Sequence, residues 1–328
     1  MMTASMDRAL LFLYAETPVH AGGDTGLGAL DLPIQREVST GLPIIKGESL
    51  KGALREHFKP LVDWDLWVAM FGAEPPKSGT AAGSLRPGSL RVHEAQLLAF
   101  PAPALAGSFA WVTCPLARAR LDRRAHLAGI TFIPGAPKAD DSAEPDDAGC
   151  LMADTRTKGG SKPRRTQVVL GPYALTAVGD AELKAWAAAL SEIALPDGPE
   201  HQFFRAKLTR DFYLASDELL QAIARECAPI VSRVQLGAED AQGSPTKTVK
   251  HGPFYSEYLP AETLLVAILE SDQPGHLDTL TSLLDGKITQ VGGDETIGKG
   301  LMWCRIVRPG DTPGEPVTAG EVVAGARP

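Results

Sequence analysis

The stretch GESLKGALREHF, residues 47–58, is the first part of the chain with a clear structural period. Leu50, Ala53 and Leu54 recur three and four residues apart, which is the spacing of one face of an α-helix. Upstream, the apolar run ALLFLYA (9–15) predicts a strand, and a glycine-rich loop separates it from the helix. The chain therefore begins as strand, loop and helix.

Further helices and strands follow along the chain. Helices are expected at 61–72, 180–193, 216–231 and 275–286. Strands are expected at 89–100, 166–171, 263–270 and the end of 291–307. Ser216 is suited to cap the third of these helices. Because no strict strand–helix–strand repeat is present, the order favours an α+β body of ferredoxin-like or RNA-recognition-motif type over a doubly wound sheet.

Two long polar segments interrupt this body. The segment at about 232–258 has strand-like ends around a tip that contains Gly and Pro and is too long for a tight turn, so we expect a projecting β-hairpin. The segment at about 133–165 is rich in Pro, Gly and charge and lacks periodicity, which predicts a mobile insertion. With these two insertions, residues 1–328 are interpreted as a single domain.

Composition indicates a cytoplasmic protein. The four cysteines lie far apart with no CxxC or CxxH pair, which argues against a zinc site and fits free thiols in a reducing compartment. The apolar run 9–15 is too short to span a bilayer and is not followed by a cleavage site of small residues. We therefore expect no membrane partner.

The charge pattern does not by itself exclude a nucleic-acid partner. The formal net charge of -8 argues weakly against nonspecific binding, but the charges are segregated along the chain. Residues 118–124 and 154–165 are basic, whereas 140–147 are acidic. Taken alone, each of these runs is expected to be a solvated loop.

The segment GLPIIKGESLKGALR (41–55) has features of a phosphate-binding site. Glycines let backbone N–H groups approach a phosphate, and the N-terminus of a helix adds positive partial charge. Lys51 and Arg55 lie four apart on one helix face, and Gly52 leaves the surface between them open. Gly52 and Gly300 stand where a P-loop needs a lysine or a hydroxyl residue, so a nucleoside-triphosphate site is not indicated.

Four segments together resemble the RAMP superfamily. They are TPVHAGGDTGLGALDLPIQRE (17–37), TGLPIIKGESLKGALR (40–55), FYSEYLP (254–260) and GGDETIGKG (292–300). Within the superfamily, the chain most resembles the backbone subunit of the type III-B (Cmr) CRISPR effector complex, over most of its length. The resemblance implies a palm of modified RNA-recognition-motif type with a projecting thumb hairpin. It further implies that the thumb interrupts a guide–target RNA duplex and that the subunit cuts the target at regular intervals.

The resemblance also implies roles for individual residues. The catalytic residues are expected to be Asp31, His20, Glu257 and Tyr258, with Asp31 as the metal ligand. The guide-RNA-binding residues are expected to be Ser49, Lys51, Gly52, Arg55, Gly292, Gly293, Gly298, Lys299 and Gly300. The implied partners are guide RNA, single-stranded target RNA, further copies of the chain in a helical filament, and other type III-B subunits.

Elementary chemistry is consistent with an endoribonuclease of this kind. RNA supplies its own nucleophile, the 2'-OH, so a site must provide in-line geometry, assistance to proton transfer and charge stabilisation at the phosphate. A divalent cation such as Mg²⁺ or Mn²⁺ held by hard oxygen ligands suits the last task. The carboxylate of Asp31 is such a ligand.

Other interpretations of the same residues stay open. Asp31 precedes Pro33 and can cap the local turn, and a loop histidine such as His20 often bonds a backbone carbonyl for structural reasons. Two other functions are also possible: a guide-RNA-binding structural subunit that does not cut, and a metal-independent endoribonuclease that processes guide RNA. Chelator sensitivity and the choice of substrate distinguish these functions.

Overall fold

The computed structural model describes residues 6–23, 30–73, 86–131, 149–154, 165–237 and 249–311. Its helices are α1 (Gly47–Phe58), α2 (Trp64–Phe71), α3 (Pro115–Leu127), α4 (Ala181–Ala194), α5 (Gln202–Arg210), α6 (Asp217–Glu226) and α7 (His276–Leu284), with 3-10 helices η1 (Pro199–His201) and η2 (Glu295–Ile297). Its strands are β1 (Asp7–Ala15), β2 (Ile44–Ile45), β3 (Leu90–Val92), β4 (Ala95–Ala104), β5 (Ser108–Thr113), β6 (Gly149–Met152), β7 (Arg165–Leu170), β8 (Tyr173–Gly179), β9 (Phe212–Leu214), β10 (Ile230–Leu236), β11 (Val249–Glu257), β12 (Leu264–Ser271), β13 (Ile288–Gln290) and β14 (Leu301–Val307). The mixed α+β class is confirmed.

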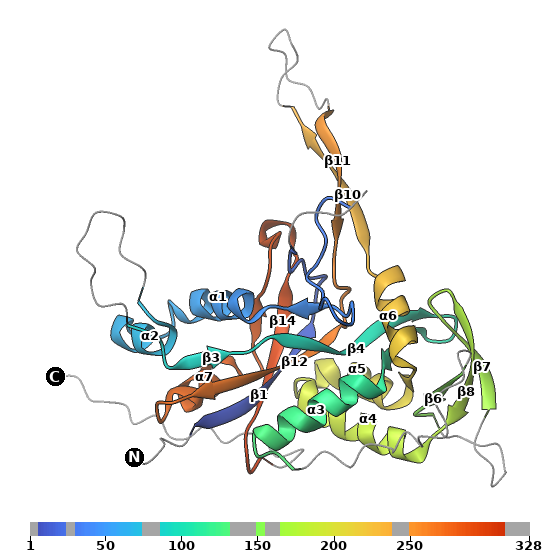
Figure 1. Ribbon diagram of the computed structural model, residues 1–328, viewed down its shortest axis with the longest axis horizontal. Helices are drawn as coiled ribbons and strands as arrows, with labels where there is room; N and C mark the ends of the chain where they lie inside the picture. Colours follow the sequence, from blue (N-terminus) through green and yellow to red (C-terminus); the bar gives the residue numbers. More distant parts are fainter. Residues whose placement is uncertain are drawn as a thin grey trace.

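Within these residues the strands form one sheet of 12 strands and a separate two-stranded hairpin (Figure 1). The order of the large sheet is β13-β14-β1-β12-β4-β5-β9-β6-β8-β7, with β2 beside β4 and β3 beside β12. Strand β1 lies antiparallel between β12 and β14. Strands β12 and β14 both begin beside the C-terminal end of β1, so the segments that precede them meet there.

The middle of the sheet is buried on both faces. Successive side chains of a strand point to opposite faces, and in β1 Leu11 and Leu13 join one core while Leu10 and Phe12 join another. Helices α1, α2 and α7 cover the first core, and α3, α4 and α5 cover the second. Burial on both faces explains why ALLFLYA is apolar at every position.

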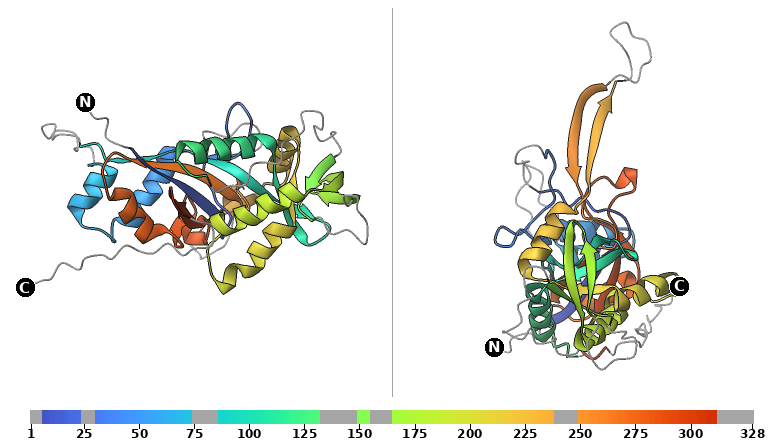
Figure 2. Two further views of the ribbon diagram at one scale, coloured as in Figure 1. Left: turned by 90° about the horizontal axis from the view of Figure 1, so that it is seen from below. Right: turned by 90° about the vertical axis from the view of Figure 1, so that its right-hand side faces the viewer.

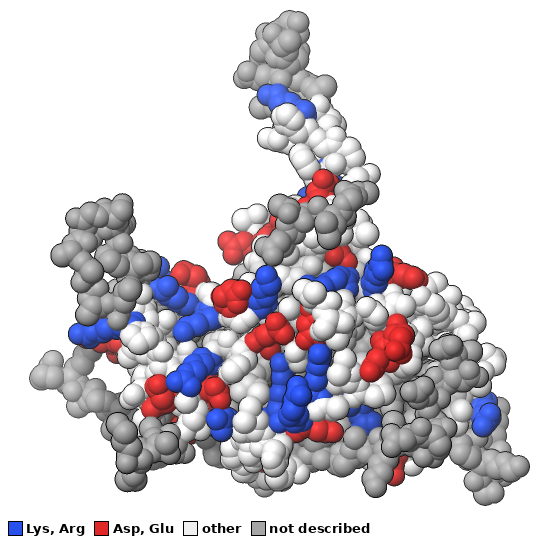
Figure 3. Space-filling view, in the orientation of Figure 1, with Lys and Arg blue, Asp and Glu red and all other residues white. Residues whose placement is uncertain are grey.

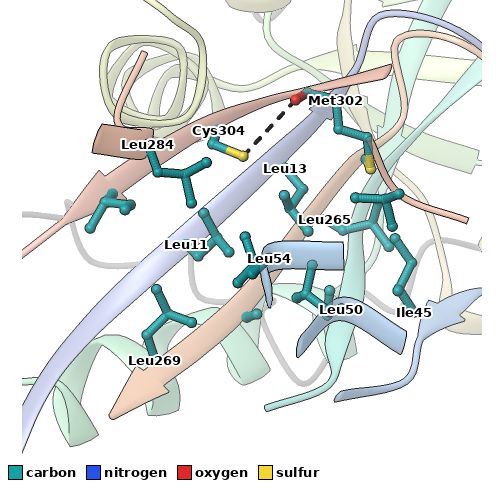
Figure 4. Close-up of a cluster of buried hydrophobic side chains, with 14 of the residues drawn as sticks. Leu11, Leu13, Ile45, Leu50, Leu54, Leu265, Leu269, Leu284, Met302 and Cys304 are labelled. Carbon is teal, nitrogen blue, oxygen red and sulfur yellow. Dashed lines mark hydrogen bonds between the residues drawn. The ribbon is translucent and has the colours of Figure 1, made fainter. Parts of the chain in front are cut away.

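The periodic face of α1 packs into the first core. Leu50 and Leu54 are fully buried there, beside Leu11 and Leu265 from the sheet (Figure 4). Removal of water from these apolar side chains is what holds α1 against the sheet. The opposite side of α1 remains available for other contacts.

Two expectations from the sequence need correction: where one helix ends, and the structure of residues 118–124. The helix expected at 216–231 has the predicted cap, with Ser216 Oγ accepting from the N–H of Leu219 at 3.1 Å, but it ends at Glu226. The run 118–124 is not a solvated loop, because it lies within α3, where Arg118 is buried. The positive charge hid a helix that packs on the sheet.

The segment at about 133–165 also differs from expectation. It contains β6, which pairs with β8 and β9 and buries Cys150 and Met152. Four residues are too few for a periodicity to be recognised. The other parts of this segment, 132–148 and 155–164, lie outside the described residues.

A two-stranded hairpin is present where the sequence predicts one. Strands β10 and β11 pair from Ile230 and Glu257 outward to Leu236 and Val249, and the hairpin projects well clear of the body (Figure 2). The expected tip, residues 238–248, lies outside the described residues. Most positions of both strands are exposed, so the hairpin has little core of its own.

The compartment expectations are met only in part. All four cysteines are free thiols, as the sequence predicts. Among the helices described, none is long and apolar enough to cross a membrane.

Candidate functional site

Three loops meet at one end of the central strands. The C-terminal end of β1 lies beside the start of β12 and the start of β14, since Tyr14 pairs with Leu264 and Ala15 pairs with Met302. The chain that leaves β1, the chain that returns from the hairpin and the glycine-rich chain before β14 therefore converge. Most of the expected site residues lie on these three segments.

The segment that contains Asp31 is attached to the root of the hairpin. Leu32 pairs in parallel with Ser256: its N–H donates to the carbonyl of Tyr255 at 3.0 Å. Its own carbonyl accepts from the N–H of Glu257 at 2.9 Å. Asp31 Oδ2 accepts from the N–H of Tyr255 at 2.7 Å, and the Asp31 side chain stays exposed. A carboxylate is thus held in a fixed place while it faces solvent.

Glu257 is buried, and its contacts lie within the protein. One carboxylate oxygen is 2.6 Å from Nη2 of Arg36, and the other accepts from the N–H of Ile34 at 3.1 Å. Arg36 also donates to the carbonyls of Gly41 and Ala224. Glu257 therefore fixes the segment that follows Asp31, and its expected catalytic role stays a prediction.

His20 lies between the hairpin root and the glycine-rich loop. Its Nδ1 is 2.8 Å from the carbonyl oxygen of Glu257, and because a carbonyl only accepts, Nδ1 is the donor in this bond. In the neutral ring, Nε2 then has the free lone pair. The backbone carbonyl of His20 accepts from Gly293, and a Cβ on Gly292 would lie 2.4 Å from the same oxygen. Only glycine fits at that position.

Tyr258 is fully buried beneath His20, with ring centres 5.4 Å apart. Its hydroxyl donates to Asp294 Oδ2 at 2.9 Å. Arg233 of β10 donates to both oxygens of the same carboxylate, at 2.7 and 2.6 Å. Asp294 is not among the site residues expected from the sequence. The sequence does contain one indication of its role. An acidic residue in a glycine-rich loop that is expected to lie near phosphates needs a cationic partner.

The expected guide-binding residues of α1 fall on two faces of the helix. Ser49 and Gly52 line a surface hollow of about 510 Å³ together with Gly292 of the segment 292–300, called here the late glycine-rich loop. A Cβ placed on Gly52 would meet nothing within 4 Å. This side of α1 is open to an approaching ligand.

Lys51 and Arg55 lie on the face of α1 that points to β3 and α2. Lys51 Nζ donates to the carbonyl of Leu90 at 2.8 Å, and the guanidinium of Arg55 lies 4.3 Å from the ring centre of Trp67. Burial, and secondly the charge of Arg55, lower the pKa of Lys51. Both basic groups have protein partners, and their expected contact with RNA stays a prediction.

The residues of the late glycine-rich loop surround the contacts of Tyr258. Lys299 Nζ is 5.4 Å from the Tyr258 ring centre, and Gly300 donates to the carbonyl of Pro18 at 2.9 Å. Gly298 adopts a left-handed conformation with φ 75°. On the face shown in Figure 3, basic and acidic side chains are interspersed.

The described residues do not by themselves make a complete metal site. No group of three or more His, Cys, Asp or Glu side chains gathers among them. Asp31 offers one exposed carboxylate, and Mg²⁺ commonly binds one or two carboxylates together with substrate phosphates and water. Asp31 fits such a cation if RNA supplies further oxygens.

Comparison with known proteins identifies the family of the chain. The RAMP superfamily matches residues 12–303. The CRISPR system Cmr endoribonuclease Cmr4 of Pyrococcus furiosus is 30% identical over 307 residues, which cover 90% of this chain and 95% of the relative. The crystal structure of oligomeric Cmr4 from P. furiosus has a TM-score of 0.66 at 26% identity and covers 92% of this chain and 98% of its own.

A second solved structure shows the same fold at lower identity. A chain of the type III-B Cmr-beta complex bound to cognate target RNA has a TM-score of 0.64 at 19% identity, with 91% of this chain and 96% of that chain covered. The sequence over most of the chain and the fold thus both point to one group of proteins. The chain belongs to the RAMP superfamily and, within it, to the Cmr4-like backbone subunits of type III-B CRISPR effector complexes.

Proposed function

We propose that this chain binds guide RNA in a cytoplasmic type III-B effector complex and cuts the complementary target RNA at regular intervals. One observation carries the proposal: the exposed carboxylate of Asp31 is held at the root of a projecting hairpin. The relative named an endoribonuclease supports the activity. The oligomeric Cmr4 crystal structure and the complex bound to target RNA support self-association and RNA as partners.

In this proposal the large sheet and its helices form a ferredoxin-like palm, and β10–β11 form the thumb. The guide runs over the hollow between α1 and the late glycine-rich loop, where Ser49 and Gly52 are open to a backbone phosphate. Lys299, in the glycine-rich loop, adds positive charge beside this path, and Lys51 and Arg55 add it at longer range from the other face of α1. The thumb interrupts the guide–target duplex and displaces a target nucleotide toward Asp31. Copies of the chain stacked along the guide repeat this arrangement.

The proposed reaction uses the 2'-OH of the target as nucleophile. The hydroxyl oxygen attacks the adjacent phosphorus and loses its proton, the bond to the 5'-oxygen breaks, and that oxygen takes up a proton. The products are a 2',3'-cyclic phosphate and a 5'-hydroxyl. A divalent cation beside Asp31 would stabilise charge on the phosphate. Asp31 holds that cation or assists loss of the proton, and His20 lies at the same end of the sheet.

A metal-independent endoribonuclease is the second candidate. The observation that favours it is the fixed ring of His20, whose Nδ1 bond to Glu257 leaves Nε2 as a base. In that case histidine acid–base chemistry cuts precursor guide RNA, and a chelator has no effect. A structural subunit that binds RNA without cutting is the third.

The decisive experiment is cleavage of end-labelled target RNA by the assembled complex. We expect cuts at regular intervals that stop on addition of EDTA and return with Mg²⁺ or Mn²⁺. A single deoxyribose at one cut position should block that cut alone, because it removes the nucleophile. Cutting through the deoxyribose position would contradict the proposed reaction, and cutting in EDTA would favour the second candidate.

A further inference from the structure

Two carboxylates hold the hairpin at neighbouring levels. Asp31 accepts from the N–H of Tyr255, which lies opposite Ser232 in the register of β10 and β11. One pair further from the root, Arg233 lies opposite Phe254 and forms its two-pronged ion pair with Asp294. The two carboxylates come from loops at opposite ends of the sequence.

The ion pair between Asp294 and Arg233 restricts movement of the hairpin. Both side chains are less than one-third exposed, and a two-pronged Arg–carboxylate contact fixes direction as well as distance. Asp294 is itself held by the hydroxyl of Tyr258, and the guanidinium of Arg233 lies 5.5 Å from the ring centre of the same tyrosine. Since Tyr258 is fully buried, the anchor reaches into the core.

The hairpin needs such an anchor because it has little support of its own. Isolated two-stranded hairpins are marginally stable, and most side chains of β10 and β11 face solvent. Without a contact above the root, the hairpin can swing about its attachment to Leu32. A swing at that level changes the angle of the strands while Asp31 stays attached to Tyr255.

We infer that Asp294 is a positioning residue for RNA cleavage: through Arg233 it fixes the angle of the hairpin relative to Asp31. The inference rests on the proposed function. In it, the hairpin places the target and Asp31 acts on it, so the angle sets the distance between carboxylate and scissile phosphate. Misplacement of reacting groups by about 1 Å can cost about a hundredfold in rate.

The test uses the assembled complex with Asp294→Asn, Arg233→Gln and the double variant. Asparagine keeps the shape of Asp294 and tolerates its left-handed backbone, φ 68°. We expect each single variant to cut target RNA roughly tenfold to a hundredfold more slowly and at a wider spread of positions. Guide and target affinities should stay within about twofold. Because both residues act through one ion pair, the double variant should be no slower than the slower single.

Asp278→Asn is the matched control, because Asp278 is an exposed acid on α7 that pairs with Arg308. It should leave rate and cut positions unchanged. Amide hydrogen exchange of the isolated chain gives a second readout that does not depend on cleavage. In Asp294→Asn, exchange should quicken in 230–236 and 249–257 and stay unchanged in β1 and β12.

Four results would overturn the inference. Asp294→Asn that cuts at the normal rate and positions shows that the anchor does not position the target. Loss of guide binding, or faster exchange throughout the sheet, shows instead a direct RNA contact or a general structural role. If the unmodified complex fails to cut at all, the proposed function is wrong and this inference fails with it.

Discussion

The ion pair between Glu257 and Arg36 allows a structural role of Glu257 to be distinguished from a catalytic role by mutation. Glu257→Gln keeps the shape of the side chain but leaves Arg36 without a charged partner, so we expect the free energy of unfolding to fall by about 2 to 3 kcal/mol. Denaturant unfolding of the isolated chain measures this. Glu200→Gln, at an exposed carboxylate, should change stability by less than about 0.5 kcal/mol.

Cleavage by the same variant gives the complementary result. If Glu257 only supports the Asp31 segment, the variant should still cut, with a modest fall in rate at temperatures where it is folded. A loss of roughly a hundredfold or more without any loss of stability would make Glu257 a catalytic group, as the resemblance to the family implies.

Glu262 predicts a dependence of stability on pH. Burial raises the pKa of its carboxyl from 4.5 to about 7, and Oε2 has no hydrogen-bond partner among the described residues. The protonated carboxyl therefore contributes to the free energy of unfolding in full below pH 4.5. This contribution is lost as the pH rises to about 7, because the carboxyl ionises at a lower pH in the unfolded chain than in the folded one.

Glu262→Gln resembles the protonated side chain and should remove this dependence. Since part of the side chain stays in water, we expect the variant to be more stable than the wild type by only about 1 to 2 kcal/mol at pH 8, and about equal at pH 4. Unfolding curves at the two pH values measure the difference. An equal effect at both would show that ionisation of Glu262 is not the cause.

At the scale of elements, helix α1 contains one residue, Gly52, at which helix stability and the proposed guide binding favour different side chains. Gly52 lies in an exposed part of the helix, and alanine is preferred there by about 0.5 to 1 kcal/mol. Gly52→Ala should thus stabilise the isolated chain. If a guide phosphate approaches this surface, the added methyl should weaken guide binding several-fold. Unchanged affinity would show that the guide does not pass over Gly52.

The hairpin tip gives a second prediction at this scale. Deletion of residues 238–246, which lie outside the described residues, should leave the body folded because the contacts of Arg233 and Tyr255 with the body lie closer to the root than the deleted residues. It should suppress or blur cleavage, since unstacking a base step requires an inserted element. Unchanged cut positions and rates in the assembled complex would contradict the thumb role.

The elements themselves were largely predictable from the sequence. Helix α1 and strands β1 and β12 have long, unambiguous apolar patterns, and the Ser216 cap follows from its hydroxyl. Short β6 and the basic helix α3 were missed because their sequences carry no such signal. The local rules work where burial follows the period of the element.

The site was predictable only as a set of residues. Asp31, His20 and Glu257 were named by resemblance, but their contacts depend on pairings between segments more than 200 positions apart in the chain. Asp294 and Arg233, which are 61 positions apart, were missed because neither is unusual until the hairpin and the loop meet. Local patterns do not record that meeting.

For the whole molecule, the sheet order is what makes a site out of distant loops. The loop after β1, the hairpin and the loop before β14 meet because β12 and β14 flank β1 and begin where it ends. The two cores keep these strands in place, so the loops can vary without loss of the scaffold. A copy of the chain in a stacked assembly would present the same site at each repeat.

The cleavage activity of Asp31→Asn in the assembled complex tests this account most directly. Asparagine keeps an oxygen that can accept from Tyr255, so the loop should stay in place while the charge is lost. We predict that guide and target still bind with normal affinity, because many phosphate contacts contribute to binding. The cutting rate should fall by at least about a hundredfold at every position. A rate near that of the wild type would contradict the account.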